Sequence, residues 1–196
     1  DGANSLKGLV GQTKALGMGA VALTDHGNLF GAYAFQKAAK EGGIKSIIGC
    51  EAYFSPSSHT DRVSNLARTR YHFLLLCENV QGYRNLSRLS SVGFLEGYYY
   101  KPRIDLGLLE QYHEGLIGTT TCIQGAVCQA IKNGDLREAQ RQIDNFVQVF
   151  GKGSFFVELM DHGIPDQKLI NNGLIELAKK NELPLIATND CHYLTP

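Results

Sequence analysis

The sequence predicts an α/β fold in which helices cover a mainly parallel sheet. Short apolar runs of strand length alternate along the chain with longer segments of helical periodicity. Strands that alternate with helices form parallel sheets, either open and doubly wound or closed into a barrel. With 196 residues, 43% of them hydrophobic, the chain is long enough for one domain with a buried core.

The first half of the chain supplies three expected strands. Helices are expected over residues 6–16, 30–40 and 80–91, and strands over residues 20–24, 46–54 and 71–77. Gly17 and the pair Gly42-Gly43 are typical helix ends. Residues 55–69 are polar and are expected to form a loop.

The second half continues the alternation. Strands are expected over residues 116–121, 154–160 and 183–188, and helices over residues 125–132, 136–150 and 165–181. The expected total is about six strands.

Composition narrows the classes of partner. Lys plus Arg equals Asp plus Glu at 19 each, so no net field attracts nucleic acid from a distance, and any DNA contact must be local. There is neither an apolar run of the roughly 18 to 20 residues that span a membrane nor an N-terminal signal segment, so we expect a cytoplasmic protein without membrane contacts. Five cysteines without a close CxxC pair indicate reduced thiols.

Potential metal ligands follow the expected strands, at the sheet edge where loops converge on a site. These residues are Asp25, His26, Glu51, Cys122, Asp190 and His192. Carboxylate and imidazole, with one thiolate, are ligands for zinc, manganese or iron. Two such ions together promote hydrolysis of phosphate esters. Phosphoester hydrolysis is therefore the expected chemistry.

Other interpretations compete at single positions. His26 alone could be an ordinary loop histidine, and Cys122 a buried thiol like Cys50, Cys77, Cys128 and Cys191, which we assign to packing. His72 lies near the start of its strand rather than its end, so a core histidine is the alternative there.

Three further histidines are not assigned to the site. His59 and His113 lie in polar stretches and are expected to be solvated, and His162 is expected in a turn. Residues 98–103 mix tyrosines with basic residues, a pattern that can stack on bases, although a packed loop is favoured. Arg103 is the best candidate there for a phosphate contact.

Four segments together resemble the PHP domain of bacterial DNA polymerase III alpha subunits. They are residues 22–28 (Ala-Leu-Thr-Asp-His-Gly-Asn), 48–53 (Ile-Gly-Cys-Glu-Ala-Tyr), 97–105 (Gly-Tyr-Tyr-Tyr-Lys-Pro-Arg-Ile-Asp) and 187–193 (Ala-Thr-Asn-Asp-Cys-His-Tyr). The first segment is typical of the wider superfamily. The third and fourth are similar to the polymerase branch.

The resemblance implies a distorted (β/α)7 barrel, with residues 1–196 forming a single PHP domain. It also implies a cluster of zinc or manganese ions held at nine positions, with Asp25 beside the ligands. Seven positions are matched, by Asp1, His26, Glu51, His72, Cys122, Asp190 and His192. The other two form a His-x-His pair on a strand expected before Asp1. The first barrel strand is therefore expected to be missing, and the domain to be incomplete at its N-terminus.

The function implied by the resemblance is that of a segment of a DNA-directed DNA polymerase, a nucleotidyltransferase of DNA replication whose magnesium site lies beyond Pro196. The segment itself is expected to be a metal-dependent phosphoesterase, such as a 3'-5' proofreading exonuclease, or to be structural. Expected partners are DNA, a proofreading exonuclease subunit and a sliding clamp. The alternatives are a free-standing phosphatase of the histidinol phosphatase type and a non-catalytic scaffold for a proofreading subunit.

Overall fold

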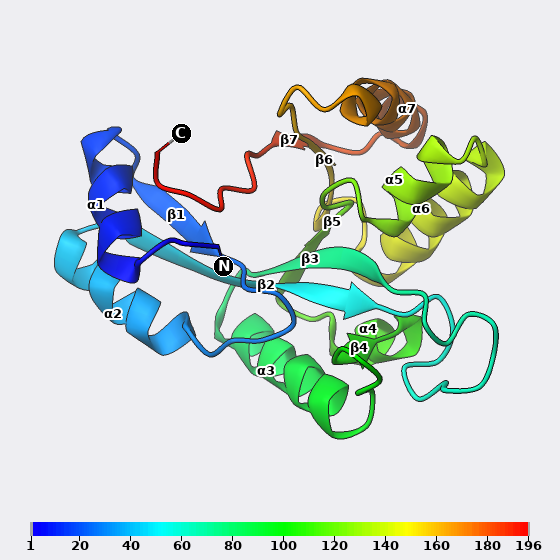
Figure 1. Cartoon of the computed structure of the whole chain (residues 1–196), viewed down its shortest axis with the longest axis horizontal. Coiled ribbons are helices and arrows are strands. Elements are labelled where there is room, and N and C mark those ends of the chain that lie inside the picture. The colour runs from blue at the N-terminus through cyan, green and yellow to red at the C-terminus, as the bar shows by residue number, and fades with distance from the viewer. Residues whose placement is uncertain (1, 196) are drawn as a thin grey trace.

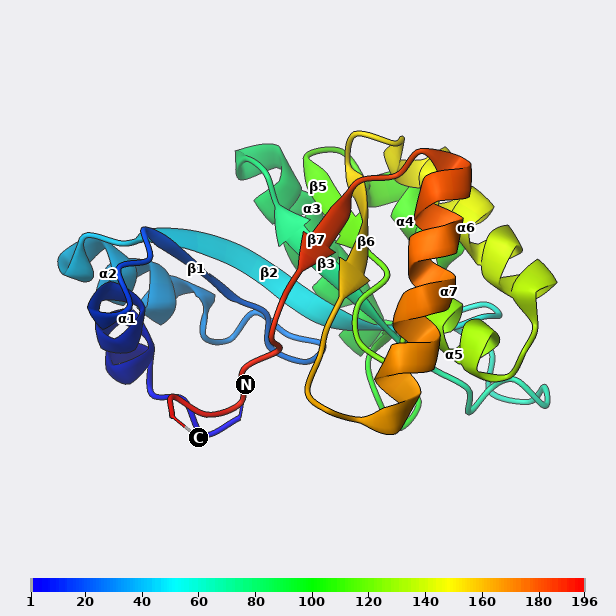
Figure 2. The same ribbon diagram turned by 90° about the horizontal axis from the view of Figure 1, so that it is seen from above.

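The fold, seen here in a computed structural model that describes residues 2–195, is a strongly curved mixed sheet with helices on its outer side (Figures 1 and 2). The strands are β1 (Ala20–Leu23), β2 (Lys45–Phe54), β3 (Tyr71–Cys77), β4 (Arg103–Ile104), β5 (Leu116–Thr119), β6 (Phe155–Leu159) and β7 (Leu185–Ala187). The helices are α1 (Leu6–Ala15), α2 (Ala32–Gly42), α3 (Val80–Leu95), α4 (Leu106–Tyr112), α5 (Ala126–Lys132), α6 (Leu136–Phe150) and α7 (Pro165–Asn181).

The strand order is β1-β2-β3-β5-β6-β7, and the short β4 pairs with β2. Four pairings are parallel, namely β1 with β2, β2 with β4, β5 with β6, and β6 with β7. Within the described residues β1 and β7 form the two edges, so the sheet curls as far as a partial barrel and stays open between them.

Strand β3 runs antiparallel to both of its neighbours. The link from β2 to β3 is the polar segment 55–70, which contains no helix, whereas a parallel return needs a longer crossover. The start of β3 therefore lies beside the end of β2, with His72 opposite Tyr53. This direction brings the beginning of β3 to the edge where the parallel strands end.

Local capping explains most of the helix starts. Asn79, Asp105 and Asp135 accept backbone hydrogen bonds at the first turns of α3, α4 and α6, as N-cap side chains commonly do. Ser5 does the same for α1, and Pro165 occupies the first turn of α7.

The expected elements are present, and the structure adds two. Strand β4 has two residues and helix α4 has seven, too few to produce a recognisable period in the sequence. The expected last strand, residues 183–188, is shorter than predicted and contains Leu185–Ala187.

Two hydrophobic clusters stabilise the fold. The larger joins the sheet to helices α3 to α7 and contains Phe73, Phe146 and Phe155. The smaller contains Val10, Leu23, Phe35, Ala39 and Ile44, and packs α1 and α2 on β1. The two form separate regions along the curved sheet.

None of the helices in the described part of the chain combines the length and the hydropathy of a membrane-spanning segment.

Candidate metal centre

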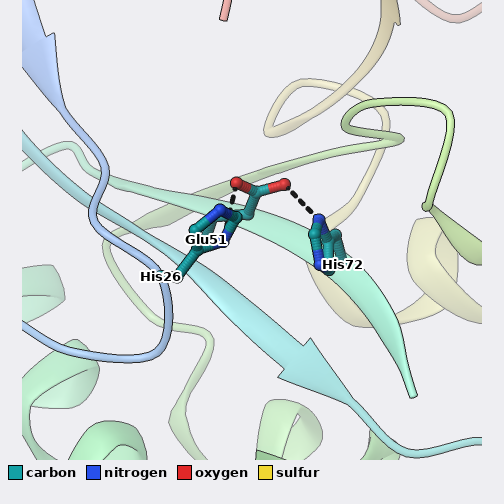
Figure 3. A group of neighbouring side chains, drawn as sticks. All are labelled: His26, Glu51 and His72. Carbon is teal, nitrogen blue, oxygen red and sulfur yellow. Dashed lines mark ion pairs between the residues drawn. The ribbon is translucent and has the colours of Figure 1, made fainter. Parts of the chain in front are cut away.

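Three side chains from three segments meet at the edge where the parallel strands end (Figure 3). Glu51 lies on β2, His26 follows β1 and His72 begins β3. One carboxylate oxygen of Glu51 lies 3.1 Å from His26 Nδ1, and the other lies 2.7 Å from His72 Nδ1. In the described part of the chain, this is the group of His, Cys, Asp and Glu residues whose ligand atoms lie within 4.8 Å of one another.

Backbone contacts place His26 beside Glu51. The amide of Gly27 donates to Glu51 O at 2.9 Å, and the amide of Glu51 donates to Asp25 O at 3.1 Å. Gly27 has a φ of 66°, and a Cβ there would lie 2.9 Å from the Tyr53 ring. Glycine is therefore required for the turn to pack this closely against β2.

Cys122 joins this group from the loop after β5. Its Sγ lies 3.4 Å from Glu51 Oε1 and 3.5 Å from His72 Nδ1. Burial, and next the negative charge of Glu51, raise the pKa of the Cys122 thiol well above its usual range. Cys122 can therefore bind a metal ion only by losing its proton.

Opposing effects set the charges of the group. Burial alone would raise the pKa of Glu51, but the hydrogen bond from His72 and the positive charge of both histidines outweigh it and lower that pKa. Burial lowers the pKa of His26 despite the opposing charge of Glu51. An ionised carboxylate beside neutral imidazole is the state in which both groups bind a metal ion.

Asp190 and His192 reach the same region from the loop after β7. The His192 ring centroid lies 6.4 Å from that of His26, and Asp190 adopts a φ of 43°. Both residues line a cavity of about 490 Å³ together with Asp25, Glu51 and residues of β1, β3 and β7. The structure thus brings them beside the three-residue group without including them in it. The expected ligand Asp1 lies outside the described residues.

Glu158 is a buried carboxylate near the site that the sequence analysis missed. It is 2% exposed, lines the same cavity and accepts hydrogen bonds of 2.5 Å from Thr119 and Thr188. Burial raises its pKa, and the charges of Asp190 and Glu51 add to this. The available signal was a lone carboxylate inside the apolar run Phe155–Leu159.

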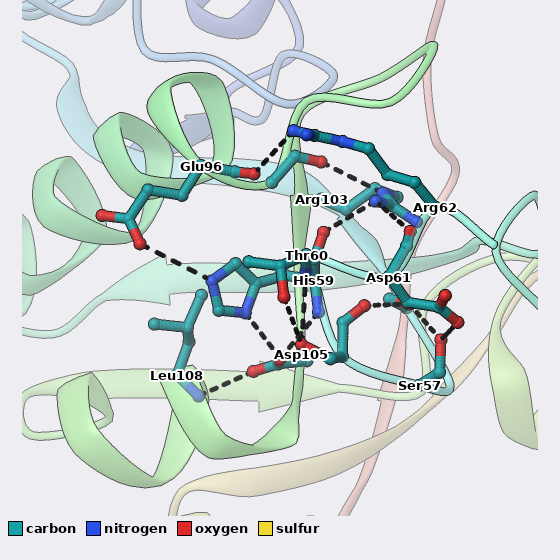
Figure 4. Close-up of polar contacts among 12 residues, drawn as sticks. Ser57, His59, Thr60, Asp61, Arg62, Glu96, Arg103, Asp105 and Leu108 are labelled. Carbon is teal, nitrogen blue, oxygen red and sulfur yellow. Dashed lines mark hydrogen bonds and ion pairs between the residues drawn. The ribbon is translucent and has the colours of Figure 1, made fainter. Parts of the chain in front are cut away.

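Arg103 does not have the exposure that a phosphate contact requires, and this expectation is wrong. The side chain is 0% exposed and donates hydrogen bonds to the backbone carbonyls of Gly97, Ala67, His59 and Asp61 (Figure 4). Its donors therefore fix the β2–β3 loop and the segment before β4.

The structure also corrects His59 and Cys191. His59 was expected to be solvated, but its side chain is 15% exposed and its Nδ1 lies 2.6 Å from Asp105 Oδ2. Asp105 also caps α4, so this contact ties the loop to that helix. Cys191 was expected in packing but is exposed.

The other unassigned residues behave differently. His162 lies in the turn before α7, as expected, and its Nε2 is 2.7 Å from Asn189 O. His113 is half-buried, with its Nδ1 3.0 Å from Glu110 O. All five cysteines are free thiols, and Cys50 and Cys128 are buried as expected.

Known proteins give the family of this arrangement. The model of the PHP domain matches residues 1–162. The chain belongs to the PHP domain family. Among relatives of this PHP domain, DNA polymerase III subunit alpha of Treponema pallidum is 47% identical over 194 residues, covering 98% of this chain and 17% of that protein. The same subunit of Borreliella burgdorferi is 44% identical over 195 residues, covering 99% and 17%. The chain thus spans 17% of the length of these relatives.

Solved structures agree with the fold of a PHP domain. A protein of Bifidobacterium adolescentis assigned as a metal-dependent phosphoesterase superposes with a TM-score of 0.62 at 13% identity, covering 98% of this chain and 84% of that one. An amidohydrolase from Chromobacterium violaceum, with bound sulfate and no metal, superposes with a TM-score of 0.59 at 14% identity and the same coverage. At these identities the likeness concerns the fold alone.

Proposed function

We propose that this PHP domain binds divalent metal ions, with zinc or manganese as the expected ions, and hydrolyses phosphoesters. The observation that carries the proposal is the contact of both Glu51 carboxylate oxygens with imidazole nitrogens, at 3.1 Å from His26 and 2.7 Å from His72. Imidazole and carboxylate donors at such separations fit one shared ion. Cys122, Asp190 and His192 are the further proposed ligands, as is Asp1, and Asp25 stands beside them.

When bound, such ions would supply Lewis-acid activation of water and neutralise charge on a phosphate ester. The chain's own residues provide the rest. Glu51 orients both imidazoles, Gly27 and Asp25 hold the turn that carries His26, and buried Glu158 holds the ends of β5 and β7 together through Thr119 and Thr188.

The wider proposal is that the domain acts within a DNA polymerase III alpha subunit, as part of a DNA-directed DNA polymerase of replication in the cytoplasm. The 47% and 44% identical relatives support it. Polymerisation on magnesium would then belong to other parts of the protein. DNA, a proofreading exonuclease subunit and a sliding clamp remain the proposed partners.

Replacement of Glu51 by Gln tests the metal centre. Glu51→Gln removes the charge that faces both imidazoles, so we expect zinc and manganese affinity, measured by isothermal titration calorimetry, to fall by at least about 10- to 100-fold. The matched control is Glu176→Gln, at a surface carboxylate that pairs with Lys179. Equal metal affinity in the two variants would contradict the proposed centre.

Hydrolysis of a chromogenic phosphodiester, followed in the same proteins, separates two roles. Metal-dependent turnover that Glu51→Gln abolishes supports the phosphoesterase. Tight metal binding without turnover would contradict it and leave the centre a structural role, as in the scaffold alternative.

A further inference from the structure

A second, open cleft of about 460 Å³ borders the candidate metal centre. His72, one of the three clustered side chains, lines the cleft, and so do Tyr71 and Gln124. The amide of His72 donates to Gln124 O at 3.1 Å, which joins the start of β3 to the loop after β5. A ligand in this cleft would therefore lie directly beside the metal centre.

The cleft is positively charged although the chain as a whole is neutral. Arg68, Arg70 and Lys101 all line it with exposed side chains, and no carboxylate is among the lining residues. The 19 basic and 19 acidic residues of the whole chain balance, so this local excess of cations is a property of the site. Such a patch selects an anionic ligand at close range.

Aromatic rings hold two of these cations. Lys101 Nζ lies 5.3 Å from the centroid of the Tyr53 ring, and Arg68 Cζ lies 5.4 Å from that of Tyr100. Both distances are within the range of cation–π attraction. Tyr100 has a φ of 63° and is 58% exposed, so the turn presents its ring to solvent beside the cations.

Buried Arg103 fixes the two segments that carry the cations. Its Nη1 donates to Ala67 O at 2.7 Å, one residue before Arg68. Its Nε donates to Gly97 O at 3.0 Å, at the start of the turn that carries Lys101. The cations are thus positioned before any ligand arrives, which reduces the entropy lost on binding.

We propose that this cleft binds the phosphodiester backbone of a single-stranded nucleic acid and directs one phosphate toward His72. The inference rests on the proposed function, because it names the substrate class of the same centre. Cations that contact the backbone, together with exposed aromatic rings that can stack on bases, are the features of single-strand binding sites. The volume suits one or two nucleotides and lies within the usual range for small-ligand pockets, about 300 to 1,000 Å³.

The test removes the three cations together. The variant Arg68→Gln, Arg70→Gln, Lys101→Gln is compared with Lys37→Gln, Arg84→Gln, Arg88→Gln, which removes three exposed cations from α2 and α3, helices that contribute no residue to the cleft lining. Binding of a fluorescent oligothymidylate of about ten nucleotides is measured by anisotropy in EDTA, at several salt concentrations. Circular dichroism establishes that each variant is folded.

We expect the cleft variant to bind at least about tenfold more weakly and to lose roughly 0.7 per phosphate contact, or roughly 2 in total, from the slope of log affinity against log salt. The control variant should retain most of the affinity. Unchanged affinity in the cleft variant, or an equal loss in the control, overturns the proposal. Competition by poly-glutamate as strong as that by unlabelled oligothymidylate also overturns it, since the cleft would then be a general anion surface.

Metal titration of the same variants keeps the two proposals apart. Unchanged manganese affinity together with lost oligothymidylate binding supports the cleft. A chain that binds manganese and hydrolyses a small phosphodiester, but whose oligothymidylate affinity ignores the three cations, overturns the cleft and leaves the proposed function standing. Failure to bind manganese overturns the proposed function, and the EDTA measurement still decides the cleft.

Discussion

At the residue scale, Asp105 links three functions in one carboxylate. It caps α4 through Leu108, accepts the amide of His59 and pairs with the His59 ring (Figure 4). Burial alone would raise the pKa of Asp105, but these hydrogen bonds outweigh it and hold that pKa below its usual value. A lowered pKa means that the folded state favours the ionised carboxylate.

The linkage predicts an acid-dependent loss of stability. The contribution of Asp105 is complete above the ordinary aspartate pKa of about 3.9 and is lost as the pH falls through the lower folded value. Asp105→Asn should therefore cost roughly 1 to 3 kcal/mol of unfolding free energy at pH 7 and less at pH 3, measured by guanidinium titration.

Asp135→Asn is the matched control, because Asp135 caps α6 through Glu138 and asparagine also caps well. A cost for Asp105→Asn that is the same at both pH values, or no larger than that of the control, would argue against the role of the His59 contact.

Residue types alone predicted the site better than they predicted the supporting contacts. His26 and Glu51 follow or end apolar strands, a position that itself indicates a site. Arg103 was misassigned because nothing in Lys-Pro-Arg-Ile-Asp indicates that its donors face backbone carbonyls of segments more than 30 residues away in the sequence. Burial of a charged side chain depends on the tertiary fold, which composition and spacing do not contain.

At the scale of elements, the loop between β2 and β3 depends on Arg103. Arg103→Lys removes the planar fork that reaches Ala67, His59 and Asp61, so several buried carbonyls lose their donors. We expect a loss of at least about 2 kcal/mol in unfolding free energy, and faster tryptic cleavage after Arg62 and Arg68 in the loop.

Arg141→Lys is the control of the same chemistry, since Arg141 forms an exposed pair with Glu138 at 2.6 Å. Exposed pairs contribute about 0 to 1 kcal/mol, so this variant should be nearly unchanged. Equal cleavage rates in the two variants would show that the loop does not need Arg103.

The directions of the elements were harder to predict than their positions. Periodicity located β3, and alternation with helices favoured parallel strands, yet β3 runs antiparallel. The sequence does contain a cue, since segment 55–70 is polar and shows no helical period. The same reversal explains why His72 reaches the site although it begins its strand.

At the scale of the whole molecule, the two hydrophobic clusters predict two levels of local stability. The cluster around Phe35 is much smaller than the one around Phe73, and it packs α1 and α2 on the edge strand β1. Small packed units open at lower free energy than the main core. Amides of α1, β1 and α2 should therefore exchange hydrogen faster than those of β5 and β6.

Phe35→Ala tests this division. Both Phe35 and Phe73 are buried, and removing either ring should cost about 3 to 5 kcal/mol where it packs. In hydrogen exchange followed by mass spectrometry, Phe35→Ala should raise exchange in α1, β1 and α2 and leave α6 and β6 nearly unchanged. Phe73→Ala should raise it everywhere. A uniform increase in both variants would mean that the chain unfolds as a single cooperative unit.

The reversed direction of β3 has a consequence for length variation. Successive side chains of an extended strand face opposite sides, so one residue gained or lost between Leu76 and His72 would turn the imidazole away from Glu51. Turns in segment 55–70 are under no such parity rule. Natural insertions should therefore be tolerated before Tyr71 and be rare after it, apart from those that add residues in pairs.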